Sequence, residues 1–222
     1  MLDIFEILGP VMVGPSSSHT AGAVRIGNMA RTLLGGVPKL ADIGLHGSFA
    51  ETGLGHGTDR ALIAGLLGMK PDNMEIPHSF ELAAEQGLRF QIHEIQLREA
   101  HPNTAVLELT HPDGHKLKMQ ACSTGGGRIL VNKLDDIEVE FTGAYHTLVI
   151  RNRDDCGYLA DVTTALSRAQ VNIANMQLCR RNKGGAAMMV IETDQPVPPT
   201  LIELLGELEG IEQITYYEKE DA

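Results

Sequence analysis

Apolar residues recur at helical spacing from Ala23 to Leu33, and two glycines follow them. The pattern therefore predicts a helix that ends at Gly35. A short strand is expected over residues 41–49. A second apolar stretch predicts a helix from about Thr58 to Leu67, with Thr58 or Asp59 as its N-terminal cap. Helical and strand patterns in alternation indicate a mixed α/β fold for this part of the chain.

Strict alternation of apolar and polar residues begins at Leu88 and predicts a strand over residues 88–93. Two further strands, at 104–109 and 116–121, flank Pro112-Asp113-Gly114, whose turn chemistry predicts a hairpin. The second of these alternates apolar residues with lysine and glutamine, which predicts a sheet with one solvated face. More strands are expected at 128–131 and 137–141, after a run of three glycines.

The final part of the chain shows a separate pattern of expected strands and helices. Its expected elements are a strand at 145–150, a helix at 158–169, strands at 171–179 and 186–191, a helix at 196–208 and a strand at 211–217. This βαββαβ order is the ferredoxin-like arrangement. We therefore predict a two-domain α/β (α+β) protein, with a mixed-sheet domain at 1–143 and a ferredoxin-like domain at 144–222.

Composition narrows the class of protein. The 222 residues include 18 Lys or Arg and 29 Asp or Glu, a formal net charge of -11, and no Trp. This balance lacks the basic footprint of a nucleic-acid binder. No apolar run approaches the length of a membrane span, and Met1–Glu6 lack the basic flank of a signal peptide. We expect a cytoplasmic protein that binds neither nucleic acid nor membranes.

The cysteines are Cys122, Cys156 and Cys179, scattered and without a Cys-x-x-Cys pair. An odd, dispersed set is neither a disulfide framework nor a self-contained zinc or iron–sulfur site. None of the 9 histidines shows the i, i+4 helical pairing of a zinc protease. We expect no metal site in this chain.

The ferredoxin-like part resembles an ACT domain, through the turn at residues 154–160 and through Val171-Asn172-Ile173. ACT domains usually bind small amino acids at dimer interfaces. The resemblance implies ligand or dimer contacts at Asp155, Gly157, Asn172 and Ile173, and a homodimer through this domain. Cys156 stands where most members have proline, and a docking module without a ligand is the alternative.

Five motifs in the first part occur in a fixed order. They are Gly14-Pro15-Ser16-Ser17-Ser18-His19-Thr20, Leu45-His46-Gly47-Ser48, Gly55-His56-Gly57-Thr58-Asp59, His101-Pro102-Asn103-Thr104 and Ser123-Thr124-Gly125-Gly126-Gly127. Together with the ACT pattern they resemble the beta chain of the iron–sulfur-dependent L-serine dehydratases in their two-chain bacterial form. The resemblance implies conversion of L-serine to pyruvate and ammonia, as in amino-acid catabolism and gluconeogenesis. It also implies an alpha-chain partner that carries the [4Fe-4S] cluster, in a hetero-oligomer.

The serine-rich motif precedes the first predicted helix. Hydroxyls of Ser16, Ser17, Ser18 and Thr20, with the N–H groups of a helix start, suit an anion. One serine is enough for a cap, so the surplus favours substrate binding, and a phosphate fits as well as a carboxylate. Ser123, Thr124, Gly125 and Gly126 follow a strand. We expect these residues to contact the approaching substrate or the partner subunit. The alternative is that they form only a flexible turn between two strands.

Histidines are the acid–base candidates, because a nearly neutral imidazole can accept the Cα proton of serine. We predict His56, flanked by two glycines, as the base. His19 is expected to position substrate or share the proton transfer. His101, beside Pro102, is third and could instead shape a loop. The competing hypothesis is a regulatory subunit that binds an amino acid or an anion, since the first domain also resembles the allosteric substrate-binding domain of some phosphoglycerate dehydrogenases.

Overall fold

The structure is a computed structural model that describes residues 11–219. The opening segment Met1–Glu6, which we expect not to be a signal peptide, lies outside them. The chain divides into two compact units, residues 1–135 and 136–222. The sequence pattern had suggested Gly143 as the boundary. No helix within residues 11–219 is both long and apolar enough to cross a bilayer.

The first unit is built on a mixed sheet. Its strands are β1 (Leu40–His46), β2 (Arg89–Ile95), β3 (Thr104–Thr110), β4 (Lys116–Gly125) and β5 (Arg128–Leu134). They lie side by side in the order β2-β1-β3-β4-β5. β1 and β2 are parallel and the other neighbours are antiparallel. The predicted hairpin at residues 104–121 is therefore confirmed as β3 and β4.

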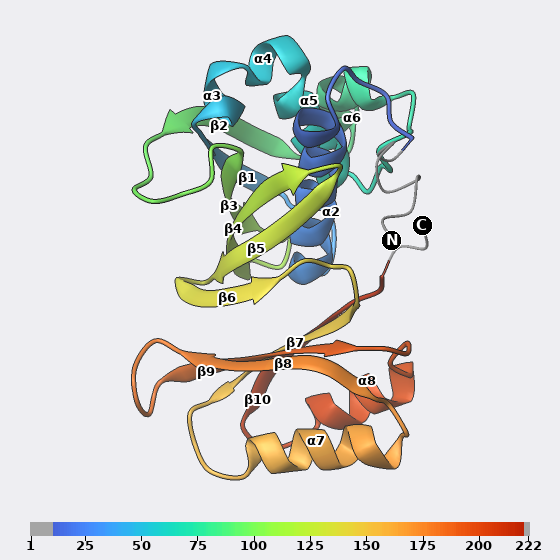
Figure 1. Ribbon diagram of the computed structural model, residues 1–222, viewed down its shortest axis with the longest axis vertical. Helices are drawn as coiled ribbons and strands as arrows, with labels where there is room; N and C mark the ends of the chain where they lie inside the picture. The colour runs from blue at the N-terminus through green and yellow to red at the C-terminus, as the bar shows by residue number, and fades with distance from the viewer. Residues whose placement is uncertain (1–10, 220–222) are drawn as a thin grey trace, which may run out of the picture. The chain divides into compact units, whose positions relative to one another are not determined.

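Two helices, α2 (Ala23–Leu34) and α5 (Thr58–Leu66), pack against each other and α2 packs on the sheet (Figure 1). Ile26, Leu62 and Leu107 are fully buried between these layers. The two helices approach closely because glycines stand at the crossing. A Cβ on Gly65 would lie 2.1 Å from the carbonyl oxygen of Val24.

Short helices fill the connection between β1 and β2, and the sequence pattern predicted none of them. They are α3 (Ser48–Glu51), α4 (Gly53–His56), the 3₁₀-helix η2 (Ile76–His78) and α6 (Ser79–Glu85). Gly47, with φ of 55°, turns the chain out of β1, so Phe49 lies in a helix and not in the predicted strand.

The predicted side-chain cap of α5 is wrong. Gly57 is the N-cap residue, in a left-handed conformation with φ of 70°, and no side chain bonds there. The carboxylate of Asp59 instead accepts the neighbouring N–H of Arg60, at 2.8 Å. The helix start is thus set by backbone freedom at a glycine.

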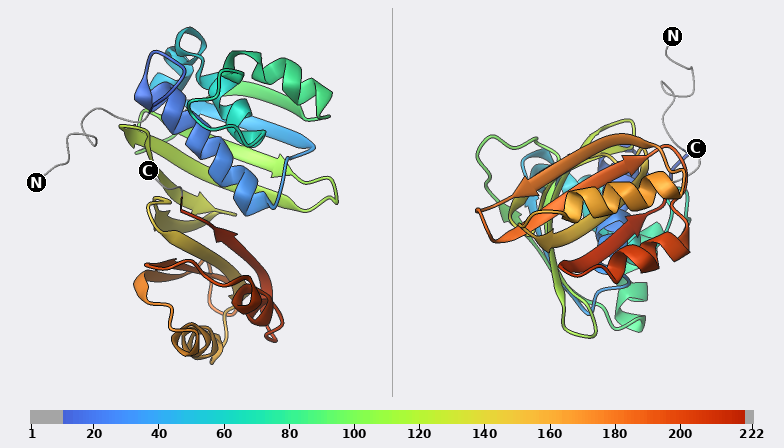
Figure 2. Two further views of the ribbon diagram at one scale, coloured as in Figure 1. Left: turned by 90° about the vertical axis from the view of Figure 1, so that its right-hand side faces the viewer. Right: turned by 90° about the horizontal axis from the view of Figure 1, so that it is seen from below.

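The second unit has the predicted ferredoxin-like order. A first strand, β6 (Ile137–Phe141), precedes this order, whose elements are β7 (His146–Arg153), α7 (Tyr158–Arg168), β8 (Ile173–Arg180), β9 (Ala186–Thr193), α8 (Pro199–Gly206) and β10 (Ile211–Tyr217). An antiparallel sheet in the order β10-β7-β9-β8 carries α7 and α8 on one face (Figure 2). Leu148, Val162 and Leu205 are buried at the centre of its core.

Candidate functional site

His19 lies in a π-helical turn, η1 (Ser17–Gly22), that continues directly into α2. The side-chain oxygen of Ser16 begins this turn by accepting the backbone N–H of His19, at 3.2 Å. Single π-turns are rare and are found often at functional sites. The wider turn carries a His19 side chain that is only 8% exposed.

Hydroxyl groups occupy both ring nitrogens of His19. Nε2 lies 3.0 Å from Oγ1 of Thr52 and 3.2 Å from Oγ of Ser48. The Thr52 hydroxyl donates its own hydrogen to the Ser48 carbonyl oxygen at 2.8 Å, so its oxygen accepts the Nε2 proton. Nδ1 is then the acceptor for the Ser16 hydroxyl, 3.3 Å away. The network assigns the Nε2–H tautomer to His19.

The ring of His56 packs nearly perpendicular to that of His19, with 4.9 Å between the centroids. Phe49 also packs edge-on against His19, at 5.4 Å. Burial lowers the pKa of His19 below its usual value, a hydrogen bond with the Ser48 backbone opposes this shift, and the nearby His56 adds to it. His19 is therefore neutral at physiological pH.

His56 is the last residue of α4, just before the left-handed Gly57. Its ring is half-buried, and its Nδ1 is buried without a hydrogen-bond partner among the described residues. Unlike His19, it retains a nitrogen that no neighbouring side chain engages.

Polar atoms of other motif residues are also buried without partners in the described part of the chain. They are Oγ1 of Thr20, Oγ1 of Thr58, Oδ1 of Asn103 and Oγ of Ser123. A Cβ on Gly22 would lie 2.1 Å from that Ser123 oxygen, so η1 and β4 approach closely here. A buried polar group without a partner costs about 1–3 kcal/mol, which a bound polar ligand recovers.

The loop at residues 101–104 ties the remaining motifs together. Its Pro102 backbone lies against Gly47, where a Cβ would be 2.8 Å from the proline oxygen. The carbonyl of Asn103 accepts the N–H of Ser123, at 3.0 Å. His101 itself is exposed, and its Nδ1 accepts the N–H of Asn103 at 3.1 Å. This bond ties the His101 ring to its own loop, and the catalytic role predicted for His101 stays a prediction.

The three glycines form the tight turn between β4 and β5, with φ angles of 98°, 62° and 75°. Arg25 of α2 donates to the carbonyl of Gly127 at 2.9 Å and holds the turn in place. A Cβ on Gly125 would lie 3.9 Å from Oγ of Ser18, so this turn lies beside η1. Thr124 is exposed and Ser17 is half-buried. All five predicted motifs therefore converge on one region of the first unit.

Sequence reasoning missed two residues of this region, Ser48 and Thr52. Ser48 belongs to the second of the five motifs, but nothing in that motif singles out its hydroxyl. Thr52 stands outside every motif, and its one available signal is its position four residues after Ser48, which places both on one side of a helical turn.

The predicted ACT contact residues lie at two chain turns of the second unit. The carboxylate of Asp155 accepts the N–H of Cys156 at 2.7 Å, and Gly157, with φ of 102°, precedes α7. The backbone N–H of Asn172 donates to the Gln195 side chain at 2.9 Å, just before Ile173 opens β8.

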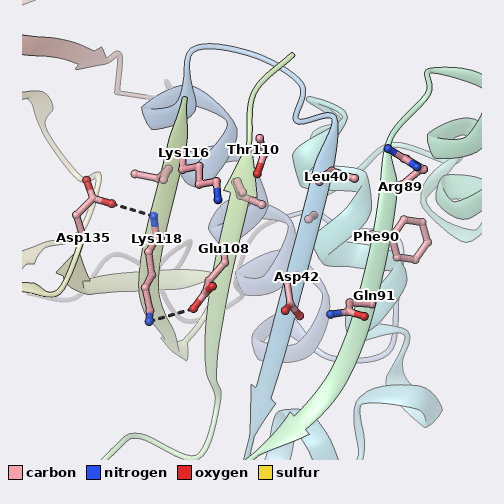
Figure 3. A pocket seen from close by; sticks show the side chains of 13 residues that line it. Leu40, Asp42, Arg89, Phe90, Gln91, Glu108, Thr110, Lys116, Lys118 and Asp135 are labelled. Carbon is pink, nitrogen blue, oxygen red and sulfur yellow. Dashed lines mark hydrogen bonds and ion pairs between the residues drawn. The ribbon is translucent and has the colours of Figure 1, made fainter. Parts of the chain in front are cut away.

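A hollow of about 620 Å³ lies elsewhere, on the sheet of the first unit. Figure 3 shows Asp42, Gln91, Glu108 and Lys118 along it, with Lys118 and Glu108 paired at 3.0 Å. Its lining includes no motif residue, so this polar face is separate from the histidine region.

The cysteines are all free. Cys122 is buried, which raises the pKa of its thiol, Cys156 is exposed and Cys179 is half-buried. Among the described residues no cysteine belongs to a group of three metal-ligating side chains. These residues do not fit an iron–sulfur cluster within this chain.

Comparison with known proteins gives two family matches. Residues 1–134 match the serine dehydratase beta chain family, and residues 146–210 match the ACT domain. The "Probable L-serine dehydratase, beta chain" of Bacillus subtilis (strain 168) is 37% identical over 212 residues, 96% of each chain. The "L-serine dehydratase, beta chain" of Peptoniphilus asaccharolyticus is 35% identical, over 95% of this chain and 94% of that protein. A D-3-phosphoglycerate dehydrogenase of Archaeoglobus fulgidus is 26% identical over 88% of this chain and 37% of its own length.

Proposed function

Because this chain belongs to the serine dehydratase beta-chain family, we propose that it is the beta subunit of an enzyme converting L-serine to pyruvate and ammonia. The observation that carries the proposal is the His19–His56 pair, set beside unpaired buried hydroxyls where five motifs meet. Such a region can hold a small amino acid and move a proton.

We assign a [4Fe-4S] cluster to an alpha-chain partner. The scattered free cysteines of this chain support that assignment, and they also suit the reducing cytoplasm in which we place the protein. When bound to the alpha chain, the cluster would supply an iron that acts as a Lewis acid on the leaving hydroxyl.

The substrate carboxylate is proposed to lie near η1 and the glycine turn. Thr20 and Ser123 offer buried hydroxyls that lack partners within the described part of the chain, and Ser18 lies beside Gly125. Hydroxyl donors are suited to a carboxylate, which only accepts hydrogen bonds. Ser16 already bonds to His19, so its part is to orient that ring.

His56 is proposed to accept the Cα proton. The hydroxyl leaves as hydroxide and later receives the proton held by His56, so that the elimination releases water. The aminoacrylate that results tautomerises and hydrolyses to pyruvate and ammonia. His19, neutral and held by three hydroxyls, positions His56 by packing against its ring. Because the His19 ring carries no charge, it does not repel the positive charge that His56 acquires with the proton.

The first test is reconstitution under anaerobic conditions with an alpha chain of the same family. This chain alone should show neither serine dehydratase turnover nor cluster absorbance, and the mixture should show both. Turnover by the isolated chain, or cluster absorbance from it, would contradict the proposal that the alpha chain carries the cluster and is needed for activity.

A second candidate is supported by the likeness to part of a phosphoglycerate dehydrogenase. In this alternative the histidine region binds an amino acid or an anion, and the ACT domain dimerises and relays the signal. The two candidates differ in their histidine variants. Loss of His56 lowers turnover if the chain is catalytic, and changes only the effector response if the chain is regulatory.

A further inference from the structure

Two histidines and an aspartate gather at the hairpin turn between β3 and β4, outside the region described above. Nδ1 of His111 lies 3.0 Å from Oδ1 of Asp113, and Nδ1 of His115 lies 2.6 Å from the same oxygen. The two imidazole rings stack with 4.5 Å between centroids. All the ligand atoms of this group lie within 4.8 Å of one another, which no other trio of such residues achieves among those described.

Backbone groups around the turn show which ring atoms carry hydrogens. Nε2 of His115 lies 2.8 Å from the carbonyl oxygen of Leu34, the last residue of α2, and must donate to it. Nδ1 of a neutral His115 is therefore a lone pair. Nδ1 of His111 accepts the N–H of Asp113, at 3.4 Å, and is a lone pair too. With His115 neutral, three acceptor atoms face one another, and a cation among them, either a second ring proton or a metal ion, removes their repulsion.

We propose that His111, Asp113 and His115 form a binding site for one divalent transition-metal ion of the zinc type, completed by water. Two imidazole nitrogens and a carboxylate oxygen are a donor set that zinc accepts. The His115–Leu34 bond matches the outer contact that orients metal-ligating histidines, whose second nitrogen usually donates to a carbonyl.

The site needs a small adjustment before an ion enters. Zinc bonds of about 2.1 Å in a tetrahedron separate neighbouring ligands by about 3.4 Å. This is more than the 3.0 Å and 2.6 Å that separate the Asp113 oxygen from the two ring nitrogens. Asp113 is exposed at the hairpin tip, and its carboxylate, which also accepts the backbone N–H of His115 at 3.0 Å, would have to move away from the two rings. Since His115 is bonded to the end of α2, the bound ion would fasten the hairpin to that helix.

The test is a titration of the full-length, metal-free chain with zinc chloride at pH 7.5, followed by calorimetry and by thermal unfolding. We expect one zinc per chain and a higher melting temperature. His111→Gln and His115→Gln should each weaken binding by at least about tenfold and abolish the thermal shift. His93→Gln is the matched control, because His93 is a partly exposed histidine that also contacts a carboxylate, Asp42, at 3.1 Å. It should behave as the unaltered chain.

Two results would overturn the proposal. One is zinc binding that survives both the His111 and the His115 substitutions. The other is no binding at millimolar zinc, which would leave a proton as the cation at this turn. Neither result bears on serine turnover, so the test of this metal site is independent of the test of the proposed function.

Discussion

His19 and His56 share one environment but differ in what surrounds their ring nitrogens. Three hydroxyl side chains, those of Ser16, Ser48 and Thr52, bond to His19. His56 keeps a buried nitrogen without a partner among the described residues. The engaged ring is suited to positioning and the unengaged one to proton transfer. The sequence alone ranked His56 first for its flanking glycines, and the contacts supply an independent reason.

Thr52→Val tests the tautomer assigned to His19. Valine keeps the shape of the side chain but removes the oxygen that accepts the Nε2 proton. A neutral hydrogen bond contributes about 1 kcal/mol, so we expect the tautomer ratio to move about fivefold toward Nδ1–H. Nitrogen-15 chemical shifts of the His19 ring measure this directly. Thr52→Ser, which keeps the hydroxyl, should leave the shifts unchanged, and identical spectra for the valine variant would refute the assignment.

The lowered pKa of His19 predicts a pH dependence with a definite sign. The unfolded chain takes up this proton near pH 6.5, whereas the folded chain resists it until lower pH. The contribution of His19 to the unfolding free energy is therefore complete above that value. It declines as the pH falls from there through the folded pKa. An NMR titration of the ring should give a midpoint below about 6.5; a midpoint at or above it would show that burial does not govern this group.

At the scale of elements, periodicity decided what could be predicted. The long helix α2, the β3–β4 hairpin and every element of the ACT unit follow clear apolar periods, and each formed near its predicted place. The helices α3 and α4 have only four residues each, too few to show a period. Thr52 lies between them, which explains why the sequence could not indicate its part in the site.

Gly65→Ala tests the crossing of α2 and α5. Alanine favours a helix by about 1 kcal/mol over glycine. Here its Cβ would overlap the carbonyl oxygen of Val24, which backbone geometry holds in place. We expect the overlap to dominate, with a net loss of about 1–3 kcal/mol in unfolding free energy. Urea denaturation monitored by circular dichroism provides the measurement.

The control for that substitution is Gly55→Ala, since a Cβ there would meet no atom within 4 Å. Its urea midpoint should stay close to that of the unaltered chain. If the urea midpoint of Gly65→Ala equals or exceeds that of the unaltered chain, the two helices can move apart without loss of stability.

At the scale of the whole molecule, the chain combines a unit of the serine dehydratase beta-chain family with an ACT domain, as its sequence resemblance implied. The order of the five motifs was visible in the sequence, but their convergence was not. It depends on contacts between residues far apart along the chain, such as Gly22 with Ser123 and Gly47 with Pro102. The net charge of -11 gave no indication of the site. The wide scatter of the cysteines agrees with the proposal that a cluster would lie on the alpha chain.

The most direct measurement of the central claim is the turnover number of the His56→Ala beta chain, reconstituted anaerobically with its alpha chain. His93→Ala, at a histidine outside the five motifs, serves as the matched control and should retain full activity. If His56 is the base, kcat for L-serine should fall roughly 100-fold or more while cluster absorbance stays unchanged. A near-normal kcat, with only the response to amino-acid effectors altered, would contradict the catalytic account and leave a regulatory subunit.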